Sequence, residues 1–495
     1  MKQEKSVAGQ RNGFVEVKNA EEAVDRLAAL HTRAADGLRE ALDRYLDRKE
    51  EPTAAERVLF RYPEIRVAYA PTGLMPITAR AYAKFQAPGV YATTVTQPGY
   101  FRPYLIEQLR PLMEEFGASV TVGLSDQAIP YPYVVTRGDE LAGTAVTAAE
   151  LARFFPTPLL AVVGDEIADS LWEEDATGMR PLALFDAART DFSLRRLVHY
   201  TGTDWRHIQP WILLTNYHRY VDQFVRLGLA ELAAGRAERL ILPGNVVIER
   251  GLPEDEAVAR ITGVAWHRFQ MPGYHLIDAE GRGTTLINIG VGPANAKNIT
   301  DHLAVLRPQC WLMIGHCGGL RQSQTIGDYV LAHAYLRQDG ILDRLLPTDI
   351  PVPALAEVQV ALQEAAAEVT GDRGEALKRR LRTGTVLTNG DRNWELRWSQ
   401  ERRRINLSRA IAVDMESGTI AAQGYRLRVP YGTLLCVSDK PLHGEIKLPG
   451  AANAFYERAV GEHLRIGLKA LDLLRGQPDT LHSRKLRSFD EPPFR

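Results

Sequence analysis

Cysteine is scarce in this chain. The 495 residues include three cysteines, Cys310, Cys317 and Cys436, and no two of them form a Cys-x-x-Cys pair. An odd and sparse set argues against a disulfide framework and favours reduced thiols in a cytoplasmic protein. No Cys and His residues have the spacing of a zinc site either. We therefore expect no bound metal and no redox cofactor.

Net charge and long apolar runs are also lacking. Lys and Arg number 60 against 61 Asp and Glu, and the formal net charge of −1 provides no attraction to nucleic acid or an acidic membrane surface. No apolar run is long enough to span a bilayer, since residues 159–164 have about the length of a strand. Residues 1–13 lack the apolar core of a signal peptide. These absences predict a soluble cytoplasmic protein without nucleic-acid or membrane partners, in which a local site holds any anion.

The length predicts two domains. A chain of 495 residues is too long for one ordinary hydrophobic core, and its 45% hydrophobic and 24% charged residues are ordinary globular values. The pattern is poorest between about residues 170 and 210, where Pro181 and Pro210 lie. We place the boundary near residue 190, with an N-terminal domain at residues 1–190 and a second domain at residues 191–495.

The N-terminal domain begins with a long amphipathic helix. Apolar residues recur at three- and four-residue steps between about Ala20 and Leu46. Short runs rich in β-forming residues follow at residues 65–70, 90–95 and 119–124. Between the last two lies a helical stretch, residues 102–117, which Pro111 is expected to kink or divide. The order strand, helix, strand predicts a βαβ unit in an α/β domain.

The second domain alternates strand and helix signals. Helical patterns occupy residues 221–235 and 299–307. Apolar strands that end in Gly, Ser, Asp or Asn are predicted at residues 240–245, 284–292, 310–319, 384–390, 410–417 and 432–439. This pattern is typical of an α/β domain, in which ligands bind at the carboxyl ends of the strands.

Two glycine-rich strand ends are candidate binding segments. Residues 288–297 contain two glycines and end in Lys297, which could meet an anion at the start of the next helix. The alternative is an ordinary strand-to-helix turn with a solvated lysine. Residues 315–319 place three glycines around His316 and Cys317 and match neither Gly-x-Gly-x-x-Gly nor a P-loop. They fit a backbone-lined pocket, with Cys317 as a small packing residue, or a tight turn without a ligand.

Two acidic strand ends are candidates for catalysis. Asp414 and Glu416 end one apolar strand, and Asp439 ends another. Carboxylates are costly to bury unless they bind something, and an α/β enzyme places its acid or base at such a strand end. Alternatively, Asp414 and Glu416 stabilise a helix N-terminus, and Asp439 caps a helix or pairs with Lys440.

The order of these segments resembles the nucleoside phosphorylase and nucleosidase superfamily. Residues 314–320 look like its ribose-side glycine loop, residues 414–417 like its Met-Glu ribose clamp and residues 437–439 like its purine-contacting aspartate. The likeness covers roughly residues 211–475. Longer segments are similar to the AMP nucleosidase family, at residues 215–224, 314–343, 388–395 and 413–426.

The resemblance implies a fold and a reaction. It implies a catalytic α/β domain with a central mixed sheet flanked by helices, together with a smaller N-terminal α/β or α+β domain. The implied reaction is the hydrolysis of AMP to adenine and ribose 5-phosphate, without a cofactor. In the family, the N-terminal domain accompanies regulation by ATP and phosphate and assembly as a homohexamer.

The resemblance also implies roles for particular residues. Asp439 would protonate nitrogen 7 of the purine, which requires a water-poor pocket that keeps the acid protonated near neutral pH, and Glu416 would hold the ribose hydroxyls. Met415 would pack against the sugar, and Trp394 would stack on the base or belong to the core. The other implied substrate-binding residues are Asp414, Gly315, His316, Gly318, Gly319, Asn389, Asp391 and Ser438.

Two positions depart from the phosphorylases of this superfamily. Those enzymes hold their attacking phosphate with two arginines, and the corresponding positions here are Ile248 and Met313. Water is therefore the expected nucleophile. The alternatives are a purine nucleoside or nucleotide phosphorylase of the same fold and a non-catalytic regulator that binds adenine nucleotides. Retention of Asp439 together with Glu416 argues against the regulator, because binding alone needs no poised acid.

Two roles stay open at this point. Glu249 is the candidate base that would activate the water. Candidate cations for the 5′-phosphate are Lys297, Arg321, Arg392, His218 and Arg219. The last two lie in a segment that related oligomers lend to a neighbouring subunit. Each of these cations is alternatively a surface charge.

Overall fold

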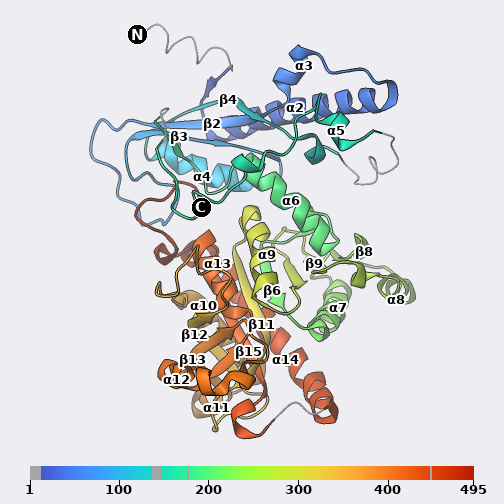
Figure 1. Ribbon diagram of the computed structural model, residues 1–495, viewed down its shortest axis with the longest axis vertical. Coiled ribbons are helices and arrows are strands. Elements are labelled where there is room, and N and C mark those ends of the chain that lie inside the picture. The colour runs from blue at the N-terminus through green and yellow to red at the C-terminus, as the bar shows by residue number, and fades with distance from the viewer. Residues whose placement is uncertain (1–12, 136–145, 175–177, 446–448) are drawn as a thin grey trace. The chain divides into compact units, whose positions relative to one another are not determined.

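The chain divides into two compact units. The computed structural model describes residues 13–135, 146–174, 178–445 and 449–495 (Figure 1). The first unit comprises residues 1–195 together with 487–495, and the second comprises residues 196–486. The division thus falls inside helix α6 (Ala187–Thr201), and the segment 487–495 belongs to the first unit. We expected two consecutive ranges that meet near residue 190.

The sheet of the first unit is mostly antiparallel. Its strand order is β1-β4-β2-β3-β5. The bounds are β1 (Val15–Val17), β2 (Arg61–Tyr69), β3 (Gly89–Thr94), β4 (Ser119–Ala128) and β5 (Met179–Pro181). Because β2 pairs antiparallel with both β3 and β4, those two strands run in the same direction with β2 between them. Strands β3 and β4 on either side of α4 (Arg102–Glu114) therefore form a split βαβ unit, in which β2 is inserted between the two parallel strands.

The helices of the first unit follow the sequence pattern closely. Helix α2 (Ala20–Arg48) confirms the predicted amphipathic helix, and it begins where the Asn19 side chain accepts a hydrogen bond from the Glu22 amide at 2.8 Å. Helix α4 (Arg102–Glu114) contains Pro111 but is not divided there. The other helices described in this unit are α3 (Ala54–Leu59), α5 (Ala148–Leu151) and most of α6.

The segment 487–495 packs firmly into the first unit. Phe494 is buried, and its amide donates to the Leu182 carbonyl at 3.0 Å. The Arg495 amide donates to Gln108 Oε1 at 2.8 Å, and the Tyr104 hydroxyl donates to the Arg495 carbonyl at 2.7 Å. The chain therefore connects the two units twice, once through α6 and once ahead of residue 487.

The second unit is built on a mixed sheet. Its strand order is β14-β13-β12-β15-β11-β6-β10-β9-β7-β8. The bounds are β6 (Trp211–Thr215), β7 (Arg239–Leu242), β8 (Val246–Glu249), β9 (Gly273–Ile277), β10 (Thr284–Asn288), β11 (Cys310–Gly319), β12 (Tyr329–Gln338), β13 (Leu381–Asn389), β14 (Ala412–Asp414) and β15 (Tyr431–Asp439). Strands β6, β10, β11 and β15 are parallel, as in an α/β domain. Strand β12 runs antiparallel to β15, and β13 and β14 follow its direction.

The sheet of the second unit closes on itself at one end. Strand β14 pairs antiparallel with β11 and joins the two sides of the curved part, with Gly318 opposite Val413. Helices lie around the sheet (Figure 1), and α9 and α14 pack next to α13 and β11 respectively. Their bounds are α7 (His218–Ala233), α8 (Glu254–Thr262), α9 (Pro293–Leu303), α10 (Ala356–Thr370), α11 (Gly374–Arg380), α12 (Trp398–Ser408), α13 (Ser417–Leu427), α14 (Pro449–Arg475) and α15 (Pro478–Leu481).

Within the described ranges, no helix combines the length and the apolarity that crossing a bilayer requires. All three cysteines are buried as free thiols.

Candidate active site

A cavity of about 330 Å³ lies where the sheet of the second unit closes. It is lined by Asn216, Tyr217, Val291, His316, Cys317, Gly318, Asn389, Asp391, Arg392, Trp394, Glu395, Val413, Asp414, Met415, Glu416, Asp439 and Pro441. Strands β13 and β14 run opposite to β11 and β15, so these strand ends do not share one edge of the sheet. The ends of β11, β14 and β15 meet for two reasons. Strand β14 pairs with the end of β11, and Gly318 of β11 lies opposite Asp439 of β15.

Glu416 is fully buried in the wall of this cavity. Its Oε1 accepts a hydrogen bond from the Gly292 amide at 2.6 Å, and its Oε2 accepts one from Asn216 Nδ2 at 2.7 Å. Burial, followed by the neighbouring Asp414 charge, raises the pKa of Glu416 to about 8. Each oxygen keeps a further lone pair, so the carboxylate can accept hydrogen bonds from a ligand's hydroxyls.

Both carboxylate oxygens of Asp414 accept hydrogen bonds from the protein. Its Oδ1 accepts from the Thr388 hydroxyl at 2.7 Å, and its Oδ2 accepts from the Ser417 amide at 2.7 Å at the N-terminus of α13. Burial raises the pKa of Asp414. This geometry matches the alternative of a carboxylate that stabilises a helix N-terminus. The side chain thus holds the turn that presents Met415 and Glu416 to the cavity.

Removing the Thr388 hydroxyl is expected to loosen this turn. Thr388 Oγ1 accepts from the Gly418 amide at 2.7 Å and donates to Asp414, so a valine leaves two buried polar groups without their partner. We expect Thr388→Val to lower the free energy of unfolding of the second unit by about 1–3 kcal/mol. Urea and thermal unfolding measure the change, and Thr388→Ser is the control that retains a hydroxyl. A valine variant as stable as the serine variant would contradict the assignment.

Asp439 ends β15 and reaches the same cavity. It is half-buried, and its Oδ1 accepts a hydrogen bond from the Ser438 hydroxyl at 2.6 Å. Ser438 Oγ also lies 3.3 Å from the Cys317 carbonyl, so the serine connects β15 to β11 and is not itself among the lining residues. The neighbouring Lys440 pairs with Glu445 at 2.5 Å. Asp439 is therefore held by a side chain on its own strand while its carboxylate faces the cavity.

The glycine segment contributes in two different ways. His316, Cys317 and Gly318 line the cavity, whereas Gly315 and Gly319 are not among the lining residues. A Cβ on Gly315 would lie 3.1 Å from Asn216 Oδ1, and one on Gly319 would lie 3.0 Å from Gln324 Oε1. These two glycines leave room for neighbouring protein side chains. The family resemblance implied a substrate-binding role for both glycines, and that role stays a prediction.

The segment after β13 forms another wall. Asn389 Oδ1 accepts from the Asp391 amide at 2.8 Å, and Asp391 Oδ2 pairs with Arg397 at 2.5 Å. Trp394 lines the cavity and also belongs to a buried apolar cluster with Leu387 and Val413. Both alternatives for this tryptophan, wall of a pocket and core aromatic, are consistent with that position.

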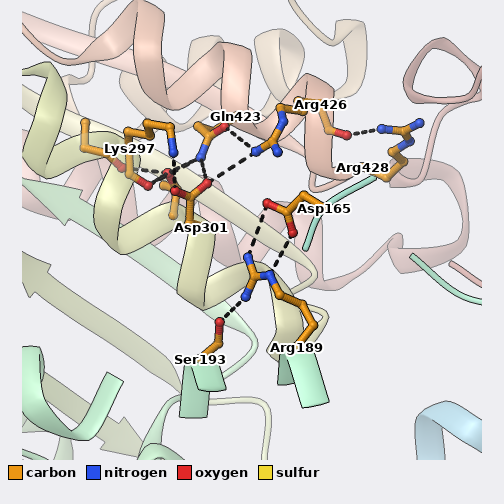
Figure 2. Close-up of polar contacts among 10 residues, drawn as sticks. Asp165, Arg189, Ser193, Lys297, Asp301, Gln423, Arg426 and Arg428 are labelled. Carbon is orange, nitrogen blue, oxygen red and sulfur yellow. Dashed lines mark hydrogen bonds and ion pairs between the residues drawn. The ribbon is translucent and has the colours of Figure 1, made fainter. Parts of the chain in front are cut away.

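Several predicted residues lie outside the cavity. Figure 2 shows Lys297 on α9 beside Asp301, with Gln423 and Arg426 of α13 at the same carboxylate. The Lys297–Asp301 and Gln423–Asp301 contacts are 2.5 Å each, and Arg426 Nη1 lies 3.3 Å from Asp301. We expected Lys297 to bind an anion of the ligand, and in the structure it pairs with the Asp301 carboxylate.

The remaining predicted cations and the candidate base are placed as follows. His218 lies 3.8 Å from Asp222 and stacks on Trp266 with ring centroids 4.0 Å apart. Neither His218 nor Arg219 lines the cavity, whereas Arg392 does. Glu249 is exposed and is not among the lining residues. Ile248 and Met313 are buried apolar residues.

Sequence reasoning missed one residue with a clear place in the site. Asn216 follows the short apolar strand β6 directly and binds Glu416. Its signal was a polar residue immediately after five apolar or β-branched ones, at residues 211–215. Among the residues that the structure describes, no group of three or more His, Cys, Asp or Glu side chains is arranged to hold a metal ion.

Comparison with known proteins decides the family. The family model "Bacterial AMP nucleoside phosphorylase N-terminus" matches residues 22–179, and "Phosphorylase superfamily" matches residues 273–472. The chain is 55% identical over 480 residues to an AMP nucleosidase of Escherichia coli (strain K12), covering 96% of this chain and 98% of that protein. The chain belongs to the AMP nucleosidase family.

Solved structures resemble a part of the chain. An AMP nucleosidase from Bacteroides thetaiotaomicron is 28% identical with a TM-score of 0.41, and the match covers 58% of this chain and 97% of that one. A purine nucleoside phosphorylase from Toxoplasma gondii is 17% identical with a TM-score of 0.39, over 56% of this chain. For this member of the AMP nucleosidase family, the superfamily match and the mixed sheet confirm the expected α/β fold of the second unit. The match at residues 273–472 includes both Glu416 and Asp439.

Proposed function

We propose that this protein hydrolyses the N-glycosidic bond of AMP to adenine and ribose 5-phosphate. The observation that carries the proposal is that Asp439 and Glu416 line one cavity in a chain of the AMP nucleosidase family. Cleavage breaks the bond between C1′ and nitrogen 9, and its electron pair moves into the purine. A water oxygen forms the new bond to C1′ and releases a proton.

Asp439 would act as the general acid in this reaction. Adenine leaves poorly as an anion, and a proton delivered to nitrogen 7 makes it a better leaving group. Glu416 would hold the ribose hydroxyls, with Met415 beside the sugar and Trp394 at the base. Asp414 keeps the Met415-Glu416 turn in place through its bonds to Thr388 and α13.

The cations of the cavity support water as the nucleophile. Among its lining residues there is one guanidinium, that of Arg392. A second, attacking phosphate would lack a pair of arginines to hold it, because Ile248 and Met313 are buried and apolar. Hydrolysis is therefore favoured over phosphorolysis.

The proposal also covers the residues that would bind the 5′-phosphate of AMP and the oligomeric assembly. Arg392 is the cavity-lining cation available to the 5′-phosphate, and His218 and Arg219 would serve a neighbouring subunit's site. The family resemblance supports a cytoplasmic homohexamer, with ATP and phosphate as effectors and the first unit as the regulatory or assembly domain. Lys297 stays a weaker candidate, since Asp301 already neutralises it.

A substrate panel tests the reaction. The protein is incubated with AMP, adenosine, GMP and IMP, with and without inorganic phosphate, and free base is measured by chromatography. We expect adenine from AMP in the absence of phosphate and at least about tenfold less turnover of adenosine, because one charge-assisted contact to the 5′-phosphate is typically worth more than 1.4 kcal/mol. A strict phosphate requirement would instead identify a phosphorylase. AMP binding without any base release would identify a regulator.

A further inference from the structure

Glu416 is held by donors from two segments that are remote in sequence. Asn216 Nδ2, just after β6, donates to Oε2 at 2.7 Å, and the Gly292 amide, just ahead of α9, donates to Oε1 at 2.6 Å. The carboxylate is fully buried, and both Asn216 and Glu416 line the cavity. Each oxygen thus has a donor from a remote segment, and a carboxylate with about four acceptor sites can still accept from a ligand's hydroxyls.

These two donors act on a carboxylate in unfavourable surroundings. The like charge that acts on it is Asp414 on β14, and the other charged residues that line the cavity are Asp391, Arg392, Glu395 and Asp439. Burial and Asp414 raise the pKa of Glu416 to about 8, whereas the bonds from the Gly292 amide, Asn216 and the Met415 backbone lower it. The Gly292 donor is a backbone amide, so Asn216 is the one of the two that a substitution can remove.

The absence of a side chain at Gly315 leaves room for the Asn216 amide. A Cβ at position 315 would lie 3.1 Å from Asn216 Oδ1 and 2.9 Å from Met313 Cε. The methionine methyl is the end of a flexible side chain and can move. The Asn216 amide cannot move without losing its bond to Glu416. The first glycine of the 315–319 segment therefore leaves room for Asn216, although the sequence had suggested room for a ligand.

We propose that Asn216 is a positioning residue for the ribose, which orients Glu416 as the acceptor for the ribose hydroxyls, and that Gly315 leaves the space this amide needs. The inference rests on the proposed function, because it gives Glu416 its ribose-binding role. If the wild-type protein releases adenine from AMP and the Asn216 variants behave in the same way, this inference alone is overturned. A wild-type protein without base release would overturn the proposed function first.

The first test compares AMP with 2′-deoxy-AMP. We expect Asn216→Ala to lower kcat/KM for AMP about 10- to 100-fold at pH 7, as expected for loss of a hydrogen bond to a charged group. The loss for 2′-deoxy-AMP should be at least about threefold smaller, because Glu416 then has one hydroxyl fewer to hold. The rising limb of the pH profile should move to higher pH. Equal losses for both substrates with an unmoved profile would show a merely structural role.

An isosteric variant covers the case in which alanine disturbs folding. Asn216→Asp keeps the volume but places a carboxyl against Glu416, so the two groups compete for ionisation. We expect a loss of AMP turnover at least as large as that of Asn216→Ala and a larger displacement of the pH profile. Asn406→Ala, at an exposed position of α12, is the matched control and should leave both properties unchanged. An Asp variant with the wild-type profile would contradict the proposal.

A double-mutant cycle tests the role of Gly315. Gly315→Ala alone should reproduce part of the Asn216→Ala effect on kcat/KM for AMP and on the 2′-deoxy-AMP ratio. In the Asn216→Ala background the same glycine substitution should cost less than about twofold, because the amide it displaces is absent. Additive effects of the two substitutions would show that Gly315 serves another purpose.

Discussion

Asp439→Asn is expected to lower kcat for adenine release from AMP by about 10²–10⁴-fold, the range that a positioned general acid contributes. Asparagine has nearly the shape of aspartate, and its carbonyl oxygen can still accept from Ser438, so the strand end should keep its conformation. What it lacks is a proton to transfer to the purine. Single-turnover measurements of adenine formation report the chemical step directly.

A change of leaving group separates acid catalysis from general damage. A ribose 5-phosphate with a 4-nitrophenolate leaving group needs no protonation, so we expect Asp439→Asn to slow its hydrolysis far less than that of AMP. Asp349→Asn, at an exposed position of the second unit, is the matched control. An equal loss for both substrates would mean that Asp439 does not act as the acid. An unchanged rate with AMP would remove it from the mechanism altogether.

Glu416→Gln is expected to lower kcat/KM for AMP by about 10²–10⁴-fold, since two hydrogen bonds from ribose hydroxyls to a buried carboxylate are each typically worth about 1.5–3 kcal/mol. The substitution also removes an ionisation. With the pKa of Glu416 raised to about 8, wild-type kcat/KM should rise with pH through that value as the carboxylate forms. The glutamine variant should lack this limb. A variant that retains the limb would assign it to another group.

Ionisation of Glu416 should raise kcat/KM but lower the free energy of unfolding. The folded-state pKa of Glu416, about 8, lies above its ordinary value of 4.5, so the folded protein binds the proton more tightly than the unfolded chain. This stabilising contribution is fully present below about pH 4.5 and is lost as the pH rises through about 8. The free energy of unfolding of Glu416→Gln should therefore depend less on pH in this window, which urea titrations at several pH values can measure.

Much of the fold could be predicted where the signal is local. The apolar period of residues 20–46 predicted α2, because three- and four-residue steps place one face of a helix on the core. Strands β11 and β15 were predicted from apolar runs that end in glycine or aspartate. Pairing was harder, since nothing in the runs of β2, β3 and β4 says that β2 lies between the other two. Pairing depends on contacts between segments that are distant in the chain.

The candidate site shows the same division. The acidic strand ends and the glycine segment could be found from residue types, and the resemblance assigned their roles. Asn216 could not, because five residues of apolar strand followed by an asparagine are an ordinary strand end. Its importance comes from a bond to Glu416, 200 positions away. Lys297 was predicted as an anion ligand from its place near the start of a helix, and only the structure shows that Asp301, one turn later, pairs with it.

The sequence by itself determined which residue types end the strands: carboxylates at two strand ends, glycines at two others and apolar residues at 248 and 313. The family resemblance implied the chemistry that these residues would carry out. Only the tertiary structure decided how the carboxylates of one strand end divide their work. Asp414 binds Thr388 and the start of α13, while Glu416 is held by Asn216 and Gly292 at the cavity. The physical reason is that a buried carboxylate takes its role from its hydrogen-bond donors, and most of these donors come from remote segments of the chain.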